Sequence, residues 1–160
     1  MTVAPDIESF AAALPRIGGL LGIDLGTKTL GLAVSDTTRS VATPLETIRR
    51  KKLTLDVEAL RLRIETRALV GIVLGLPLNM DGSEGPRAQS TRAFARNTAD
   101  RLDLPIAFWD ERLSTVAAER ALLEADASRQ RRSEVIDQVA AGVILQGCLD
   151  RLSWMSREES

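Results

Sequence analysis

Three acidic residues stand where apolar segments of the chain begin or end, and carboxylates in such places can carry chemistry. Asp24 closes the apolar segment 20–23, Glu111 closely follows the apolar segment 105–109, and Asp137 heads a face of small apolar residues on a predicted helix. Convergent carboxylates repel one another until a cation neutralises them. Two divalent ions about 3.5–4 Å apart can activate water and stabilise the leaving oxygen of a phosphodiester. The acids therefore predict a site that binds Mg²⁺ or Mn²⁺ and hydrolyses phosphodiester bonds.

Each acid also has a structural explanation that the residues alone leave open. The Asp24 carboxylate can accept hydrogen bonds from the backbone amides of the following turn, residues 26–28. Glu111 can form a surface ion pair with Arg112. Asp137 lies in the first turn of its predicted helix, where the helix dipole favours a negative charge by about 0.3–1 kcal/mol.

The composition narrows the possible chemistry. The 160 residues include no histidine and no tyrosine, which excludes Ser-His-Asp and Cys-His nucleophile systems, His-ligated zinc and tyrosine nucleophiles. The single cysteine, Cys148, excludes an internal disulfide and a Cys-x-x-Cys metal site. An enzyme with this composition must use carboxylates, lysine or hydroxyl groups, with a hard metal ion held by oxygen ligands.

The charge and hydropathy of the sequence indicate how it could bind nucleic acid and whether it could bind a membrane. The net charge of −1 gives no overall positive field that would attract nucleic acid. Basic residues cluster locally instead, at 49–52 and at Arg129, Arg131 and Arg132, and such runs are either solvated surface or a rim that grips phosphates. The sequence has no apolar run long enough to span a membrane and no basic signal-peptide region. We therefore expect a cytoplasmic protein without a membrane partner.

The apolar pattern predicts the elements that position the acids. Strands are expected at 20–24, 30–35, 41–43, 68–76 and 105–109. Helices are expected within 7–14 and at 53–64, from Pro86, from Ser114 or Thr115 to Ala125, and at 134–152. The first three strands form an antiparallel hairpin or meander and the last two run parallel, which gives an α/β fold with a five-stranded mixed sheet flanked by helices. Carboxyl ends of parallel strands meet at one sheet edge, where Asp24 and Glu111 are then neighbours.

The length suits a single domain. We expect that domain at residues 19–155, after an N-terminal extension at 1–18 that docks a short helix. Residues 128–132 are expected to form a mobile basic link before the last helix, and residues 156–160 a flexible tail.

Four motifs, in this order, resemble one family, the YqgF family, also called RuvX. They are GIDLGTKTLGLAVSD at 22–36, GLPLNMDGSEGPRA at 75–88, DERLSTVAAER at 110–120 and DQVAAGVILQGCLD at 137–150. Members are similar to Holliday junction resolvases and are named as nucleases of pre-16S ribosomal RNA. The resemblance implies a ribonuclease H-like fold and a cytoplasmic hydrolase that matures the 5′ end of small-subunit ribosomal RNA.

The resemblance also assigns roles to residues. It favours Glu111 over Asp110, which points to the other face of the strand, and it implies Asp24, Glu111 and Asp137 as the metal-binding catalytic set. Related junction resolvases carry an acid in the central strand where this chain has residues 75–77, Gly-Leu-Pro, so Glu111 has to substitute for it. Six further motif residues suit contacts with substrate phosphates: Gly26, Thr27, Lys28, Asn79, Arg87 and Arg112.

Three other functions compete with this hypothesis. A resolvase of Holliday junctions or branched DNA would use the same acids, and a non-catalytic RNA-binding ribosome assembly factor would keep the fold without turnover. The turn after Asp24 is also similar to the first phosphate loop of actin-like ATPases, but that architecture needs a duplicated domain, and this length holds no second copy. The sequence leaves a monomer and a weak homodimer equally open.

Overall fold

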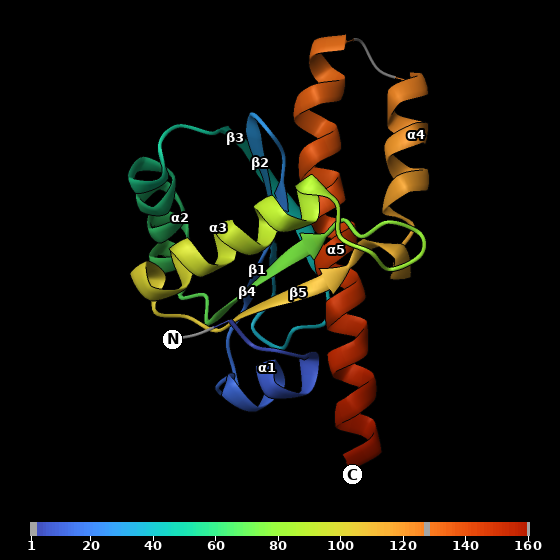
Figure 1. The fold of residues 1–160 in the computed structure, drawn as a ribbon. Coiled ribbons are helices and arrows are strands. Elements are labelled where there is room, and N and C mark those ends of the chain that lie inside the picture. The colour runs from blue at the N-terminus through green and yellow to red at the C-terminus, as the bar shows by residue number, and fades with distance from the viewer. Residues whose placement is uncertain (1–2, 127–128, 160) are drawn as a thin grey trace.

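The fold is built on a mixed sheet of five strands (Figure 1), and the candidate site lies where the carboxyl ends of its parallel strands meet. The computed structural model describes residues 3–126 and 129–159 of the chain. In spatial order the strands are β3 (Ala42–Arg49), β2 (Thr29–Ser35), β1 (Leu20–Leu25), β4 (Gly71–Leu76) and β5 (Ile106–Asp110). β1 runs antiparallel to β2 and parallel to β4, and β5 runs parallel to β4. The predicted α/β class and five-stranded mixed sheet are confirmed.

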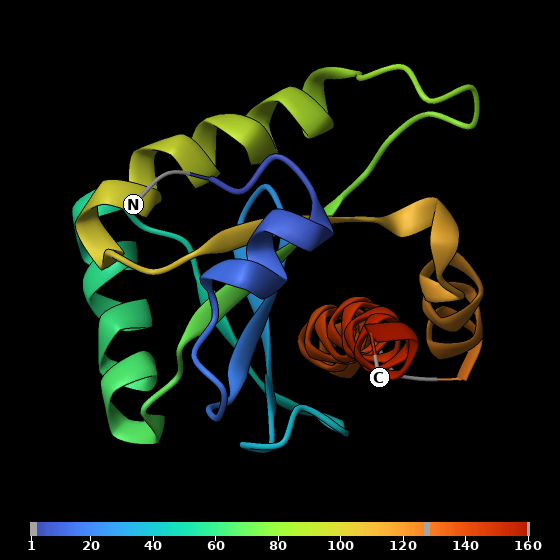
Figure 2. The same ribbon diagram turned by 90° about the horizontal axis from the view of Figure 1, so that it is seen from below.

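Helices cover both faces of the sheet, which explains why β1 and β4 are buried along their whole length. One face packs against α2 (Leu53–Arg67) and α3 (Pro86–Leu102). The other face packs against α1 (Ile7–Ala13) and the long helix α5 (Arg129–Glu159), beside which lies α4 (Val116–Asp126). Figure 2 looks along α5 and shows α4 next to it, on the side of the sheet opposite α2 and α3. No helix among the described residues is long and apolar enough to cross a bilayer.

Three glycines in the central strands allow α5 to approach the sheet closely. A Cβ atom on Gly31 of β2 would overlap the backbone carbonyl of Asp137, and one on Gly75 of β4 would lie 2.5 Å from the side chain of Ile144. A Cβ atom on Gly22 of β1 would likewise lie 2.7 Å from a side-chain carbon of α5. The helix therefore rests on the strand backbones, and this contact brings Asp137 next to β2.

Two predicted boundaries are wrong. β3 continues past Pro44 to Arg49, because β3 is an edge strand and an edge position tolerates a residue without an N–H group. α5 begins at Arg129, where we expected a mobile link, and ends at Glu159, so residues 156–159 are helical and form no tail. The link residue Ser128 and the terminal Ser160 lie outside the described residues, as do the side chains of the basic cluster at Arg129, Arg131 and Arg132.

The N-terminal extension is built into the fold. Its helix α1 buries Phe10 completely in the core beneath α5. Ahead of α1, Val3 forms a parallel bridge with Ile106 of β5, and the Ala4 N–H donates to the Ile106 carbonyl at 2.8 Å. The extension therefore adds a short strand-like contact along the outer edge of β5.

The close approach of α5 yields a first prediction. Gly31→Ala should lower the free energy of unfolding by about 1–3 kcal/mol or more, since the new methyl group meets helix backbone rather than a flexible side chain. Urea denaturation followed by circular dichroism measures the change. The control is Gly85→Ala, whose Cβ would meet only Asn79 atoms at 3.8 Å. Equal losses in the two variants would show that the contact with α5 is not tight.

Candidate functional site

Asp24 is a buried carboxylate whose partner comes from a distant helix. It lies near the carboxyl end of β1, is 5 % exposed and pairs in register with Gly31 of β2. Its Oδ1 accepts a hydrogen bond from Nη2 of Arg120 at 2.8 Å. Of the turn amides expected to donate to Asp24, that of Gly26 donates instead to the Thr29 carbonyl at 2.9 Å. The structural explanation for Asp24 therefore changes from a local turn to a long-range ion pair.

Glu111 reaches the same guanidinium from the other side of β4. β5 ends at Asp110, and Glu111 opens a 3-10 turn, η1 (Glu111–Leu113), which directs its side chain toward Asp24. The side chain of Glu111 is 9 % exposed, and its Oε1 accepts from Nη1 of Arg120 at 3.2 Å. Asp110 instead binds Arg112, with 2.7 Å between Oδ2 and Nη2. The surface ion pair expected for Glu111 and Arg112 thus belongs to Asp110.

Arg120 of α4 holds the two acids together, and the sequence alone did not single it out. Burial raises the pKa of Asp24 and of Glu111, while the nearby Arg120 opposes both shifts. Burial also disfavours the charged guanidinium, but the two carboxylates outweigh this cost and raise the pKa of Arg120. This edge of the sheet therefore holds one positive charge between two negative ones.

Asp137 lies beside this pair but faces another partner. Its Oδ2 accepts a hydrogen bond of 2.6 Å from the Thr29 hydroxyl at the start of β2. The charge of Asp137 is close enough to raise the pKa of Asp24. Within the part of the chain that the structure describes, no three acids are arranged tightly enough to hold a metal ion as they stand.

The chemistry of these side chains nevertheless fits a hard cation. Asp24 is buried and the side chain of Glu111 is only 9 % exposed, and carboxylate oxygens are the ligands that Mg²⁺ and Mn²⁺ prefer. Their surroundings already stabilise a cation, the guanidinium of Arg120. A divalent ion bound between these two carboxylates would have to displace that guanidinium, which is attached to α4 rather than to the sheet.

The residues predicted to contact phosphates fall into three groups. Gly26, Thr27 and Arg87 line one cavity beside the β1–β2 turn. Lys28 is exposed at the tip of that turn. The remaining two, Asn79 and Arg112, shape the loop between β4 and α3.

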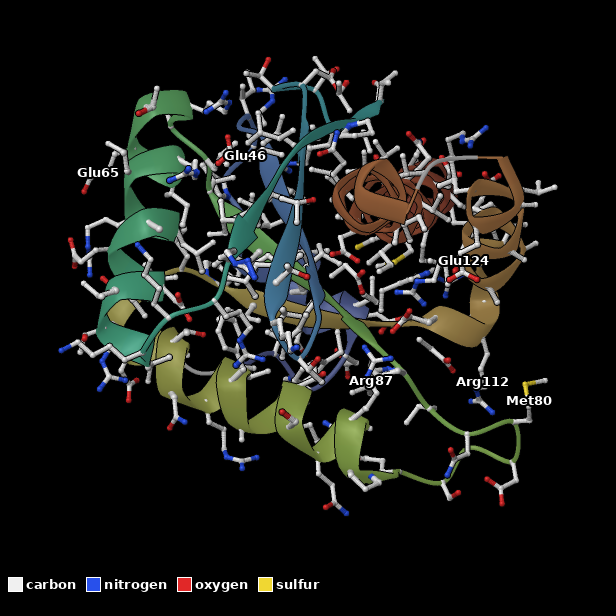
Figure 3. All side chains as sticks on the ribbon, turned by 90° about the horizontal axis from the view of Figure 1, so that it is seen from above. Glu46, Glu65, Met80, Arg87, Arg112 and Glu124 are labelled. Carbon is white, nitrogen blue, oxygen red and sulfur yellow. The ribbon has the colours of Figure 1, made fainter. Side chains whose placement is uncertain are left out.

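That loop is held by hydrogen bonds of its own. The Asn79 amide donates to the Ser83 hydroxyl at 3.0 Å, and Arg112 donates to the Met80 carbonyl at 3.1 Å. Figure 3 shows Arg112 and Met80 side by side at this loop, while Arg87 projects from the start of α3 toward the sheet. Asn79 and Arg112 thus have structural partners in the described residues.

The arrangement defines a class of protein. A five-stranded sheet in the order β3-β2-β1-β4-β5, with acids at one edge and a long helix across one face, is the ribonuclease H-like fold. A solved structure from Thermus thermophilus, "T. thermophilus RuvC in complex with Holliday junction substrate", superposes with a TM-score of 0.52 at 12 % identity, covering 85 % of this chain and 96 % of that one. At this identity the likeness shows the fold alone.

Sequence comparison gives the family. The family model described as "RuvX: Holliday junction resolvase" matches residues 18–151, and the chain belongs to this family. Relatives named "Putative pre-16S rRNA nuclease" occur in Cereibacter sphaeroides strain ATCC 17025, 70 % identical over 96 % of both chains, and in Paracoccus denitrificans, 68 % identical over 98 % of this chain and 99 % of that one. The resemblance to the YqgF family is confirmed.

The electrostatics of Asp24 give a second prediction. Because its pKa is raised, the Asp24 carboxyl holds its proton more tightly in the folded protein than in the unfolded chain. Protonation of Asp24 therefore stabilises the fold fully below the unfolded pKa of 3.8, and this stabilisation is lost as pH rises through the folded pKa. Asn cannot titrate. Without metal, the unfolding free energy of Asp24→Asn minus that of the native protein should therefore increase as pH rises from about 4 to about 7.

Asp110→Asn is the matched control with the opposite sign. The hydrogen bond from Arg112 lowers the pKa of Asp110, so its contribution to stability is present above the unfolded value and is lost on acidification. Denaturant titrations in EDTA from about pH 3 to about pH 7 measure both variants, because the contribution of Asp110 changes only at the acidic end of this range. The same pH trend in the two variants would contradict the assignment of Asp24 as a carboxylate dominated by burial.

Proposed function

We propose that the protein is a metal-dependent nuclease that hydrolyses phosphodiester bonds in pre-16S ribosomal RNA. The observation that carries the proposal is a pair of carboxylates, the buried Asp24 of β1 and the 9 % exposed Glu111 of η1, that share one cation, the guanidinium of Arg120. Their fold class and family agree with this chemistry. The names of relatives about 70 % identical over nearly the whole chain support the RNA substrate. The proposed role in ribosome biogenesis implies a protein that acts in the cytoplasm.

The metal ligands in this proposal are Asp24, Glu111 and Asp137. A bound Mg²⁺ or Mn²⁺ supplies an activated water and stabilises the leaving oxygen of the phosphodiester. The protein's own part is to present carboxylate oxygens from β1, from η1 and from α5 at one edge of the sheet. When Arg120 withdraws from the acids, its guanidinium is available to pair with phosphate oxygens of the substrate.

Branched DNA is the second candidate substrate. The family description names a Holliday junction resolvase, and the same acids would serve that reaction. An ATPase and a purely RNA-binding protein fit the molecule less well. The described residues form one sheet domain rather than the two that an actin-like ATPase needs. A ribosome assembly factor that only binds RNA would have no use for two acids placed together where burial disfavours their charged forms.

Cleavage assays give the third prediction. The native protein should cleave a structured RNA that contains the 5′ end of pre-16S rRNA in Mg²⁺ or Mn²⁺. Asp24→Asn and Glu111→Gln should each reduce the rate by about two orders of magnitude or more, since a catalytic metal supplies several kcal/mol. Gel analysis of end-labelled RNA, with a four-way DNA junction in parallel, measures the rate and compares the substrates.

Asp110→Asn is the control for the cleavage assay, because its carboxylate binds Arg112 and should not be needed. Equal cleavage by native protein and Asp24→Asn would mean that the activity belongs to another site or to a contaminant. Absence of cleavage of either substrate by the native protein, with RNA binding retained, would favour the assembly factor.

Arg120 gives the fourth prediction. Arg120→Gln should lower the metal-free unfolding free energy by on the order of 2 kcal/mol, since two buried carboxylates lose a charged hydrogen-bond donor. The same variant should bind Mn²⁺ more tightly, because the cation no longer competes with the guanidinium. Isothermal titration calorimetry measures the affinity, and thermal melts with and without Mn²⁺ measure the stability.

The matched control is Arg112→Gln, which removes an arginine from the other acid–arginine pair of this turn. Its Mn²⁺ affinity should equal that of the native protein. Weaker or unchanged Mn²⁺ binding by Arg120→Gln would show that the metal does not occupy the position of the guanidinium.

A further inference from the structure

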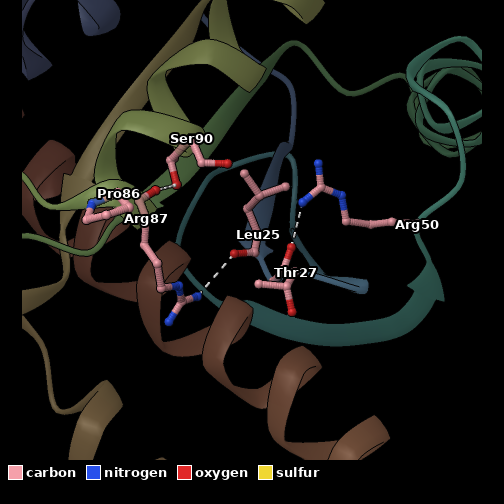
Figure 4. Close-up of a pocket in the computed structure, with 8 residues that line it drawn as sticks. Leu25, Thr27, Arg50, Pro86, Arg87 and Ser90 are labelled. Carbon is pink, nitrogen blue, oxygen red and sulfur yellow. Dashed lines mark hydrogen bonds between the residues drawn. The ribbon is translucent and has the colours of Figure 1, made fainter.

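A small cavity opens between the β1–β2 turn and the start of α3 (Figure 4). Its volume is about 210 Å³. Leu25, Gly26 and Thr27 of the turn form one wall. Arg50, which follows β3, and Arg87 of α3 form the sides, and Figure 4 shows their guanidiniums reaching the turn from opposite sides.

Both arginines of this cavity are anchored on backbone rather than on acids. Arg50 donates through Nη1 to the Gly26 carbonyl at 2.7 Å and lies over the ring of Phe94 at 5.9 Å. Arg87 donates through Nη2 to the Leu25 carbonyl at 3.3 Å. Among the described residues, no carboxylate forms an ion pair with either arginine. Within the described part of the chain, neither guanidinium of this cavity is therefore held by a carboxylate at ion-pair distance.

The surroundings of the cavity add to its positive potential. α3 begins at Pro86 after Gly85, which provides no side-chain cap for the amides of the first turn, such as that of Arg87. Hydroxyl groups of Thr27 and Ser90 lie in the wall and can donate further hydrogen bonds. The lining contains no aromatic ring on which a base could stack. These features suit a phosphate group rather than a nucleobase.

The cavity adjoins the acidic site. The charge of Arg87 acts to lower the pKa of both Asp24 and Glu111, so its guanidinium stands within electrostatic reach of the two acids. The cavity wall also begins at Leu25, the residue that follows Asp24. An anion held between Arg50 and Arg87 would thus lie next to the two carboxylates without occupying their place.

We propose that this cavity is a phosphate subsite, in which Arg50 and Arg87 hold a backbone phosphate of the nucleic acid beside the one that is cleaved. The identity of the ligand rests on the proposed function, whereas the anion preference rests on the cavity itself. The run 49–52, which the sequence alone presents as surface charge or a basic rim, thereby gains a specific role for one of its members. Arg50 acts in substrate binding and takes no part in the acid pair.

Binding of a short labelled single-stranded RNA of mixed sequence, followed by fluorescence anisotropy in EDTA, tests the proposal without cleavage. Arg50→Gln should weaken binding several-fold and reduce the slope of log K against log salt concentration by about 0.7–1, the loss of one phosphate contact. Arg87→Gln should act in the same way, and it keeps the contacts of Arg50 with Gly26 and Phe94 if Arg50→Gln folds poorly.

Arg49→Gln is the matched control, because it removes the same charge from the neighbouring residue, which is exposed and is not part of the cavity wall. Its salt slope should stay at the native value. An equal loss in Arg49→Gln and Arg50→Gln would overturn the proposal and assign the effect to the general basic field. Unchanged binding in both cavity variants would overturn it as well.

A second readout separates this proposal from the proposed function. Inorganic phosphate at millimolar concentration should raise the melting temperature of the metal-free native protein and leave that of Arg50→Gln unchanged. If the native protein cleaves no RNA but shows this shift, the subsite stands and the nuclease proposal fails. If it cleaves RNA and Arg50→Gln cleaves with unchanged KM, the subsite proposal fails and the nuclease stands.

Discussion

Arg120 places one guanidinium between two carboxylates, that of Asp24 on β1 and that of Glu111 just after β5, which lie on either side of β4. Neither acid could remain charged and buried alone without a cost of several kcal/mol. The ion-pair network therefore allows the fold to keep Asp24 and Glu111 together before any metal arrives. It also ties α4 to the sheet edge, so the position of this helix and the charge balance of the site depend on each other.

Much of the fold follows from short-range patterns in the sequence, while the partners of the acids do not. Continuous apolar runs mark β1 and β4, and the acids at the ends of β1 and β5 are visible directly, which is why Asp24 and Glu111 could be predicted as neighbours. Arg120 lies nine residues beyond Glu111 on an amphipathic helix. Which arginine of such a helix turns inward depends on how α4 docks against α5, and that packing involves residues far apart in the sequence.

The glycines of the central strands likewise have roles that depend on long-range packing and that local sequence patterns do not predict. Glycine in a strand is usually read as a weak point or a bulge. Gly22, Gly31 and Gly75 are instead positions where another helix needs the space of a side chain. The register that brings Gly31 opposite Asp24 also brings Asp137 against β2, because the helix backbone fills the gap above Gly31. The packing of α5 on β2 thus determines where Asp137 lies, and this position cannot be predicted without knowing how the strands pair.

The N-terminal segment has a consequence for how molecules of this protein meet. Exposed strand edges are templates on which other chains add strands and aggregate. Here Val3 and Ala4 already occupy part of the outer side of β5 at Ile106. On the opposite margin, Pro44 interrupts the row of donors along β3, next to a register shift. Each margin of the sheet therefore carries a feature that disfavours the addition of a strand from another molecule.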